Sequence, residues 1–259
     1  MTKRSGEREE FNEGKVKRAI LRVGVTDAVA GDILETVKRD LYNGITTEEI
    51  YRMVHQLLDR KKAVRFGLKE AMLDLGPDGH YFESFVGKMF QTLDHSVRLR
   101  ERVQGMCVAH EVDAIVEKGA ERYMVECKFH NSPGMKCNIQ TALYTYARYL
   151  DVNESLPCIS PWLVTNTKFT TDAIQYAKCM GMRLLGWRYP EERSLENLID
   201  EHRLYPLTFL GLKKAYERSL LDRNFILLRD VVNNKECLYE LLPEKDAEAV
   251  LLRAKEMLS

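Results

Sequence analysis

The stretch His110–Lys128, with the sequence HEVDAIVEKGAERYMVECK, decides the fold of the middle of the chain. Apolar and polar residues alternate before and after Gly119-Ala120, and a period of two is typical of β-strands. Glycine at the first position of a two-residue loop favours a type II′ turn. The stretch therefore predicts an antiparallel hairpin in which facing residues have numbers that add up to 239, as those of Gly119 and Ala120 do.

This register brings charged residues face to face along the hairpin. The predicted pairs are Lys118 with Glu121, Glu117 with Arg122, Glu111 with Lys128, and Asp113 with Glu126. Three pairs join opposite charges, whereas the fourth places two carboxylates ~4.5–5.5 Å apart at Cβ, where like charges cost stability. We therefore expect a cation between Asp113 and Glu126, and Mg²⁺ suits the pair because it takes one or two carboxylates and keeps several waters.

Lys128 has the same parity as Glu126, so its ammonium group is expected on the same face of the hairpin. There it would orient an attacking water and stabilise the charge that develops on a phosphate. The alternative is a solvated hairpin whose charges form ordinary surface ion pairs.

The segments around the hairpin predict a mixed sheet with helices on both faces. Apolar spacing indicates helices near residues 82–93, 139–150 and 172–180, and strands near residues 97–103, 162–165 and 182–187. The order α-β-β-β-α-β-α-β is typical of an α/β domain. Because Gly76-Pro77-Asp78-Gly79 marks a boundary, we expect domains at residues 1–75, 76–190 and 191–259, of which the first and last are mainly helical.

Composition and charge exclude several classes of protein. The 259 residues are 45% hydrophobic and 30% charged, which is typical of a soluble globular protein. No apolar run approaches the ~20 residues of a membrane span and no signal peptide is visible, so the expected location is the cytoplasm, without membrane contact. The six cysteines form no CxxC, which argues against a zinc ribbon and favours small buried thiols.

Lys plus Arg equals Asp plus Glu at 39 each, so any binding of nucleic acid has to come from a local patch. Arg98, Arg100 and Arg102 share one face of a predicted strand and are candidates for contacts with phosphate. A solvated edge strand explains these arginines equally well.

An ordered set of motifs resembles the Mrr-like branch of the PD-(D/E)XK nucleases over about residues 78–188. The matching residues are Glu83, His110-Glu111-Val112-Asp113, Glu126-Cys127-Lys128, Gln140 with Tyr144, Val164-Thr165-Asn166, Phe169-Thr170 and Ala173. The resemblance implies a restriction-endonuclease-like fold that hydrolyses DNA, in which Asp113 and Glu126 bind Mg²⁺ or Mn²⁺. It also implies that Lys128 serves the nucleophilic water and that Gln140 and Glu83 support the site. The stretch before Asp113 lacks the Gly-rich turn of many members.

Gln140 and Tyr144 are four residues apart and therefore lie on one face of the predicted helix. We expect the Gln140 amide to reach the site while Tyr144 packs beneath it. Alternatively, both residues cap the sheet.

The N-terminal region resembles the ATP-cone, a nucleotide-binding regulatory module, over residues 2 to about 75. The similarity rests on Lys3-Arg4-x-Gly6, on Phe11-Asn12-x-x-Lys15-Val16-x-x-Ala19-Ile20, and on the Thr46-to-Glu49 capping box at Ile45–Ile50. The resemblance implies that Lys3, Arg4 and Lys15 face the phosphates of ATP or dATP. Ser5 and Asn12 replace aspartates of the usual pattern.

The last segment is similar to degenerate helix-hairpin-helix modules, which grip the DNA backbone without reading sequence. The similarity rests on Tyr205-Pro206-Leu207, on the helix through Leu220-Leu221, on Asn224–Asp230 and on a final helix with apolar positions Ala247, Val250, Leu251 and Ala254. The 11 basic and 14 acidic residues of 191–259 fit a packing or oligomerisation domain equally well.

The sequence as a whole predicts an α/β chain: a restriction-endonuclease-like mixed-sheet core, preceded by a mainly helical ATP-cone and followed by a small helical domain. The expected activity is Mg²⁺-dependent endonucleolytic cleavage of DNA, regulated by ATP or dATP. A homo-oligomer is expected because one such site cuts one strand. The alternative is a catalytically silent, nucleotide-responsive DNA-binding or assembly protein.

Overall fold

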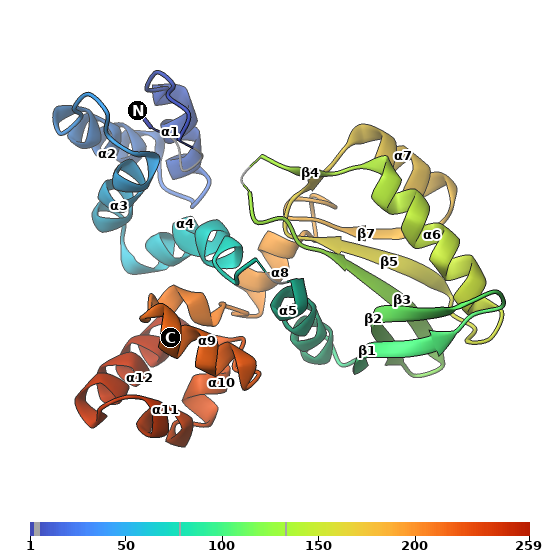
Figure 1. Cartoon of the computed structure of the whole chain (residues 1–259). Coiled ribbons are helices and arrows are strands. Elements are labelled where there is room, and N and C mark those ends of the chain that lie inside the picture. Colours follow the sequence, from blue (N-terminus) through green and yellow to red (C-terminus); the bar gives the residue numbers. More distant parts are fainter. Residues whose placement is uncertain (3–5, 78, 133) are drawn as a thin grey trace. The chain divides into compact units, whose positions relative to one another are not determined.

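The computed structural model of the chain describes residues 1–2, 6–77, 79–132 and 134–259. These residues form two compact units, Met1–Lys69 and Glu70–Ser259 (Figure 1). Lys3 and Arg4, which the sequence assigns to a nucleotide site, lie outside the described residues.

The first unit is helical. It contains α1 (Glu13–Leu21), α2 (Asp27–Arg39), α3 (Thr47–Leu57) and most of α4 (Arg60–Leu73). The predicted capping box is present: the Glu49 backbone N–H donates to the Thr46 hydroxyl at 3.1 Å, and the Thr46 backbone N–H donates to the Glu49 carboxylate at 2.8 Å. Hydrogen bonds from Thr46 and Tyr42 lower the pKa of Glu49 to about 2, so the cap is ionised at neutral pH.

The second unit is built on a mixed five-stranded sheet with the order β1-β2-β3-β5-β7. Its elements up to the last strand are α5 (Gly79–Thr92), β1 (Ser96–Gln104), β2 (Ala109–Lys118), β3 (Glu121–Lys128), β4 (Lys136–Cys137), α6 (Ile139–Asn153), β5 (Ser160–Thr165), β6 (Lys168–Phe169), α7 (Thr171–Cys179) and β7 (Arg183–Leu185). β1, β2 and β3 are antiparallel, whereas β3, β5 and β7 are parallel. The predicted mixed α/β fold is therefore confirmed. The two-residue strands β4 and β6, which pair with each other, were not expected because they are too short for a periodic pattern.

Helices cover both faces of this sheet, as Figure 1 shows. Leu163 of β5 packs in one apolar cluster with α6 and α7. Its neighbour Trp162 packs against Phe90 of α5, with ring centroids 5.5 Å apart. Because adjacent strand residues point to opposite faces, α5 lies on one side and the pair α6–α7 on the other.

The predicted hairpin register holds over half of its length. Facing residues add up to 239 from Lys118–Glu121 to Ala114–Val125, and Gly119 has a φ of +61°, as the first position of the turn requires. The register does not extend further, so the predicted ladder pairs of Asp113 with Glu126 and of Glu111 with Lys128 are wrong.

Of the predicted ion pairs along the hairpin, one forms. Arg122 donates to the carboxylate of Glu117 at 2.5 Å, as expected from their facing positions. The Lys118 ammonium instead donates to the Leu93 carbonyl at 2.9 Å, and Glu121 accepts from the Tyr123 hydroxyl.

The remaining helices of the second unit form a helical region that contacts α5. They are α8 (Leu195–Glu201), the 3-10 helix η1 (Leu207–Leu210), α9 (Lys214–Asp222), α10 (Leu228–Asn233), α11 (Glu236–Leu241) and α12 (Glu244–Leu258). Lys88 of α5 forms an ion pair with Asp230 at 3.1 Å, and the Tyr81 hydroxyl donates to Asp222. These contacts, through α9 and α10, fix the segment on α5, and its DNA-binding role stays a prediction.

Two further expectations concern thiols and membranes. Of the six free cysteines, Cys137 and Cys158 are buried, whereas the other four are partly or fully exposed, so the expectation of buried thiols holds for two. None of the helices in the described ranges is long and apolar enough to cross a membrane.

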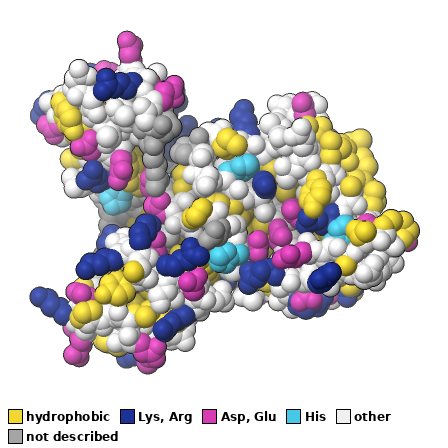
Figure 2. Space-filling model, in the orientation of Figure 1, with side chains coloured by type: hydrophobic (Ala, Val, Ile, Leu, Met, Phe, Trp, Pro, Cys, Tyr) yellow, Lys and Arg dark blue, Asp and Glu magenta, His cyan; other side chains and the backbone are white. Residues whose placement is uncertain are grey.

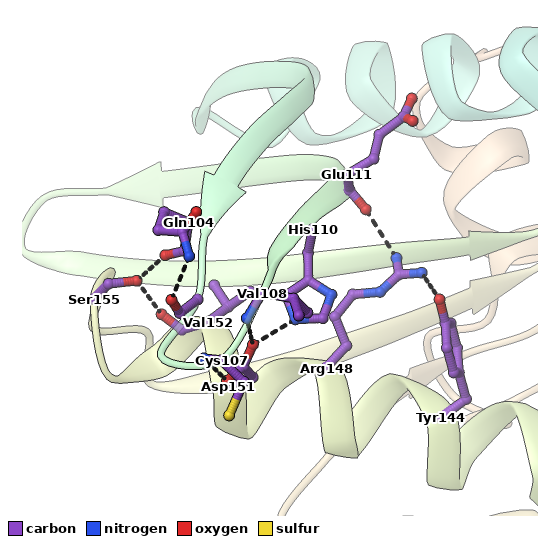
Figure 3. A network of polar contacts seen from close by, with 11 residues as sticks. Gln104, Cys107, Val108, His110, Glu111, Tyr144, Arg148, Asp151, Val152 and Ser155 are labelled. Carbon is purple, nitrogen blue, oxygen red and sulfur yellow. Dashed lines mark hydrogen bonds and ion pairs between the residues drawn. The ribbon is translucent and has the colours of Figure 1, made fainter.

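The turn between β1 and β2 is fastened to α6 by Asp151 (Figure 3). The Asp151 carboxylate accepts the backbone N–H groups of Cys107 and Val108 at 2.7 and 3.2 Å, and it lies 2.7 Å from His110 Nε2. A Cβ atom at Gly105 would clash with this carboxylate and lie 2.8 Å from the Val108 carbonyl oxygen. Glycine is therefore needed here for a close approach of the chain.

We expect Gly105→Ala to lower the free energy of unfolding by about 1–3 kcal/mol, because the added methyl group forces the turn away from Asp151. Gly31→Ala is the matched control: it lies inside α2, where an added Cβ meets no atom within 4 Å, and should stabilise by about 0.5–1 kcal/mol. Thermal unfolding followed by circular dichroism measures both. Equal melting temperatures for Gly105→Ala and the wild type would contradict the tight turn.

Candidate active site

Asp113 lies at a break in the sheet. The pairing of β1 with β2 skips Arg100–Asp113, and the pairing of β2 with β3 ends at Ala114, so within these described strands Asp113 has no registered neighbour. Arg100 has a φ of +54°, in the left-handed region that residues other than glycine rarely adopt. β1 and β2 are therefore both irregular at the point where Arg100 and Asp113 are skipped in the pairing.

The side-chain alternation of β2 shifts by one residue at this break. His110 is bonded to Asp151 of α6, whereas Ala114 is in register with Leu99, which packs against α5. Two even-numbered residues of one regular strand would face the same way. The shift frees the Asp113 carboxylate, whose Oδ2 accepts the backbone N–H of Cys127 at 2.7 Å.

Glu126, on β3, is held by an arginine of α6. Arg148 Nη1 donates to Glu126 Oε2 at 2.5 Å, and the two side chains are 11% and 13% exposed. The same guanidinium donates to the Glu111 carbonyl oxygen at 3.0 Å and to the Tyr144 hydroxyl, as Figure 3 shows. The Tyr144 ring lies 4.6 Å from the guanidinium carbon, which adds a cation–π contact.

Burial and mutual repulsion disfavour the charged forms of these acids. Burial, together with the charge of Asp113, raises the pKa of Glu126 to about 7, although Arg148 and Lys128 act to lower it. Burial also raises the pKa of Asp113, against the Cys127 hydrogen bond and the charge of Arg148. Among the described residues the pair therefore lacks a full countercharge.

Two other predicted site residues, Lys128 and Glu83, interact electrostatically with this pair. Lys128 is exposed, and its charge acts to lower the pKa values of both Asp113 and Glu126, so the three residues are brought together. Glu83 of α5 joins them: burial first, and then the charge of Asp113, raises its pKa, whereas Arg100, 3.5 Å away, lowers it.

Gln140 and Tyr144 do not behave as the sequence predicts. Gln140 is exposed, and its side-chain oxygen accepts from Asn138 at 3.2 Å; among the described residues its side chain has no hydrogen bond to Asp113 or Glu126. Tyr144 is 56% exposed, so the expectation that it packs beneath the site is wrong. It instead supports Arg148, one helical turn further along α6.

Arg148 is the site residue that the sequence analysis missed. It lies four residues after Tyr144 and eight after Gln140, so the three share one face of α6. It is also the one charged residue between Ile139 and Leu150. That isolation was a usable signal, because a single charge in an otherwise uncharged stretch of a helix needs a partner.

The donor set fits a hard divalent cation. Among the described residues no group of three or more His, Cys, Asp or Glu forms a ready-made metal cage. Two carboxylates are nevertheless sufficient for Mg²⁺, which retains several waters. Asp113 and Glu126 have oxygen donors only, and their raised pKa values mean that a cation would relieve repulsion.

The strand face of Arg98, Arg100 and Arg102 is less basic than the sequence suggests. Arg98 forms an ion pair with Glu117 at 3.3 Å and Arg100 with Glu83 at 3.5 Å. Figure 2 shows basic and acidic side chains interspersed over the face that it draws. Two of the three proposed phosphate contacts are thus engaged within the protein.

In the first unit, the described part of the predicted nucleotide site is the start of α1. The Asn12 side chain accepts the Lys15 backbone N–H at 2.9 Å and so caps the helix, as the usual aspartate would. The exposed Lys15 ammonium lies 3.4 Å from Glu9.

Comparisons with known proteins match each of the three regions. Residues 1–66 match the model of the ATP cone domain, residues 76–186 that of a restriction endonuclease, and residues 205–258 that of the AF1548-like C-terminal region. An uncharacterized protein of Archaeoglobus fulgidus is 44% identical over 158 residues, which are 60% of this chain and 90% of the relative. The crystal structure of AF1548, a protein of unknown function, superposes with a TM-score of 0.62 at 38% identity, covering 69% of this chain and 97% of the other.

The raised pKa of Glu126 makes the stability of the metal-free second unit depend on pH. Its folded pKa of about 7 lies above the ordinary value of ~4.3, so the folded state binds the extra proton between these values. The free energy of unfolding should therefore fall as pH rises through this interval, by on the order of 3 kcal/mol for Glu126 alone, and Glu126→Gln should remove this part of the fall.

Urea unfolding in a chelator between about pH 5 and about pH 8 measures this difference. The fluorescence of Trp162 and Trp187, the two tryptophans of the chain, reports on the second unit. Glutamine keeps an acceptor for Arg148, so the variant changes mainly the charge. A constant difference in stability between wild type and Glu126→Gln at all pH values would contradict the raised pKa.

Proposed function

Because the chain belongs to the restriction endonuclease family of Mrr-like proteins and carries an N-terminal ATP cone, we propose that it is a metal-dependent DNA endonuclease regulated by a nucleotide. The observation that supports the proposal is that Asp113, whose carboxylate accepts the Cys127 N–H, and Glu126 both feel the charge of Lys128, and that the charge of Asp113 raises the pKa of Glu126. The reaction is hydrolysis of a phosphodiester: water adds to phosphorus, one P–O bond breaks, and the leaving alcohol takes up a proton.

Each residue has a defined part in this proposal. Asp113 and Glu126 would hold Mg²⁺ or Mn²⁺, which when bound polarises the phosphate and makes water more acidic. Asp113 is oriented by the Cys127 N–H, so one oxygen is fixed and the other remains available. Lys128, exposed beside both acids, would position the attacking water and stabilise charge on the phosphate. Glu83 would supply a further oxygen to the same area.

Arg148 favours a second candidate function. Its guanidinium neutralises Glu126 at 2.5 Å, as a resident cation would, so the chain is also compatible with a silent DNA-binding or assembly protein that takes no metal. In the endonuclease, Arg148 would instead be displaced toward Tyr144 and the bound phosphate when a cation enters.

The assembly state is a further part of the proposal. One such site cuts one strand, so double-strand cleavage needs two copies related by a two-fold axis. Exposed apolar side chains gather on α6 and the β1–β2 turn (Figure 2), namely Leu143, Tyr144, Leu150, Met106 and Val108. We keep a homo-oligomer as the expected state.

Asp113→Asn, Glu126→Gln and Lys128→Gln should each lower Mg²⁺-dependent cleavage of plasmid DNA by about 10²-fold or more, because each removes a charge needed in the transition state. Asparagine is preferable to alanine at Asp113, since alanine would leave the buried Cys127 N–H without an acceptor and cost about 1–3 kcal/mol. The measurement is the nicking and linearisation rate with Mg²⁺ and with chelator.

Lys118→Gln is the matched control for Lys128→Gln, because it removes one exposed lysine from the other end of the same hairpin. It should cleave at the rate of the wild type. A fully active Asp113→Asn or Glu126→Gln would refute the site, and a wild type without activity in Mg²⁺ or Mn²⁺ would favour the silent protein.

ATP or dATP should raise the melting temperature of the N-terminal unit, since a ligand that binds only the folded state stabilises it, by ~2.7 kcal/mol at one hundred times Kd. Lys15→Ala should remove this shift. Lys17→Ala, which removes a half-buried lysine of the same helix that pairs with Asp27, should retain it. Calorimetry with each nucleotide measures binding, and an unchanged shift in Lys15→Ala would exclude this lysine from the nucleotide site.

A further inference from the structure

The short strands β4 and β6 place two lysines side by side. They pair in parallel with Lys136 opposite Lys168 and Cys137 opposite Phe169. Both lysines are exposed, whereas Cys137 and Phe169 are buried, so the two ammonium groups extend from the same outer face. Like charges at facing positions of neighbouring strands are destabilising. This ribbon would therefore be stabilised by an anion.

The ribbon lies next to the candidate active site. Lys128 is in register with Thr165, whose hydroxyl donates to the Lys128 carbonyl at 2.7 Å, and β6 begins three residues later. The Asn166 side chain bonds both the N–H and the carbonyl of His130, which ties together the segments that leave β3 and β5. The charges of Lys128 and Glu126 both act on the pKa of Cys137, so the active-site groups reach the ribbon.

The segments around the ribbon contain no acid. Residues 129–150 and 157–171 include no Asp or Glu, although the chain as a whole has 39. Among the described residues, ion pairs neutralise Arg98, Arg122 and Arg148 of this unit, whereas none involves Lys136 or Lys168. In a chain of zero net charge, this is a local basic surface.

β4 and β6 each lead into the N-terminus of a helix, and this adds to the positive potential at the two lysines. β4 leads through the cap residue Asn138 into α6, and β6 leads through Thr170 into α7. Because the two strands are parallel and in register, the two helices begin side by side, and helix N-termini carry partial positive charge.

We propose that Lys136 and Lys168 form a clamp for the DNA backbone, binding phosphates next to the one that is cut. The inference rests on the proposed nuclease function and names its substrate surface. The contacts are with phosphate alone, so they add affinity without sequence preference. The sequence predicts phosphate contacts from Arg98, Arg100 and Arg102, but Arg98 and Arg100 form ion pairs within the protein. In this proposal Lys136 and Lys168 make the phosphate contacts instead.

The test is the salt dependence of DNA binding by Lys136→Gln/Lys168→Gln. A fluorescent duplex is titrated with protein in Ca²⁺, which keeps a divalent cation present while cleavage is avoided. Losing two phosphate contacts should lower the slope of log K against log[salt] by about 2 and weaken binding equally for unrelated sequences. The control is Lys245→Gln/Lys255→Gln, two exposed lysines of α12, which should bind as the wild type does. Melting temperatures of both variants should equal or exceed that of the wild type.

The outcomes separate this inference from the proposed function. An unchanged slope in Lys136→Gln/Lys168→Gln, with a wild type that binds and cuts DNA, overturns the clamp and leaves the nuclease intact. A reduced slope with a wild type that never cuts supports the clamp and overturns the nuclease. A wild type that binds no DNA overturns both.

Discussion

The hydrogen bond from the Cys127 backbone N–H to the Asp113 carboxylate occupies the point where the β2–β3 ladder stops. In a regular antiparallel hairpin the Cys127 N–H would donate to a backbone carbonyl of a neighbouring strand. The Asp113 side chain would then take no part in the hydrogen bonding between the strands. Here the Asp113 carboxylate replaces the backbone carbonyl as the acceptor of this N–H. The hydrogen bond therefore holds the acid at the sheet, near Glu126. The left-handed backbone at Arg100 is the matching distortion on the neighbouring strand, and conformations of this kind cost on the order of 1 kcal/mol or more.

The carboxylates of Asp113 and Glu126 repel each other at this break, and the basic side chains around them offset the repulsion only in part. Arg148 offsets the charge of Glu126, and Tyr144 and the Glu111 carbonyl hold the guanidinium in place. The pKa of Glu126 nevertheless stays near 7, because burial and the charge of Asp113 outweigh the arginine. The Arg148 ion pair and a bound divalent cation would each offset the charge of Glu126, so the proposed function depends on which of the two the site holds.

Much of the fold followed from the sequence, because periodicity and turn chemistry are local. The hairpin register was correct for the residues closest to Gly119, where the turn fixes it, and wrong beyond Ala114, where the strand shifts its alternation. No local pattern signals that shift, since it depends on Asp113 and Arg100 meeting across two strands. The charge of Asp113 raises the pKa of Glu126, so the two acids interact although they do not face each other in the ladder, and their role as a site stays a prediction. Arg148 was missed because its partner is far away in sequence.

The most direct test of metal binding by Asp113 and Glu126 is a crystal structure of the full chain with Mn²⁺, read by anomalous scattering. We expect one anomalous peak in contact with the carboxylates of Asp113 and Glu126, with the Arg148 guanidinium moved away from Glu126. A structure at saturating Mn²⁺ in which Arg148 still bonds Glu126 and no peak lies between the two acids would show that this pair does not bind the metal.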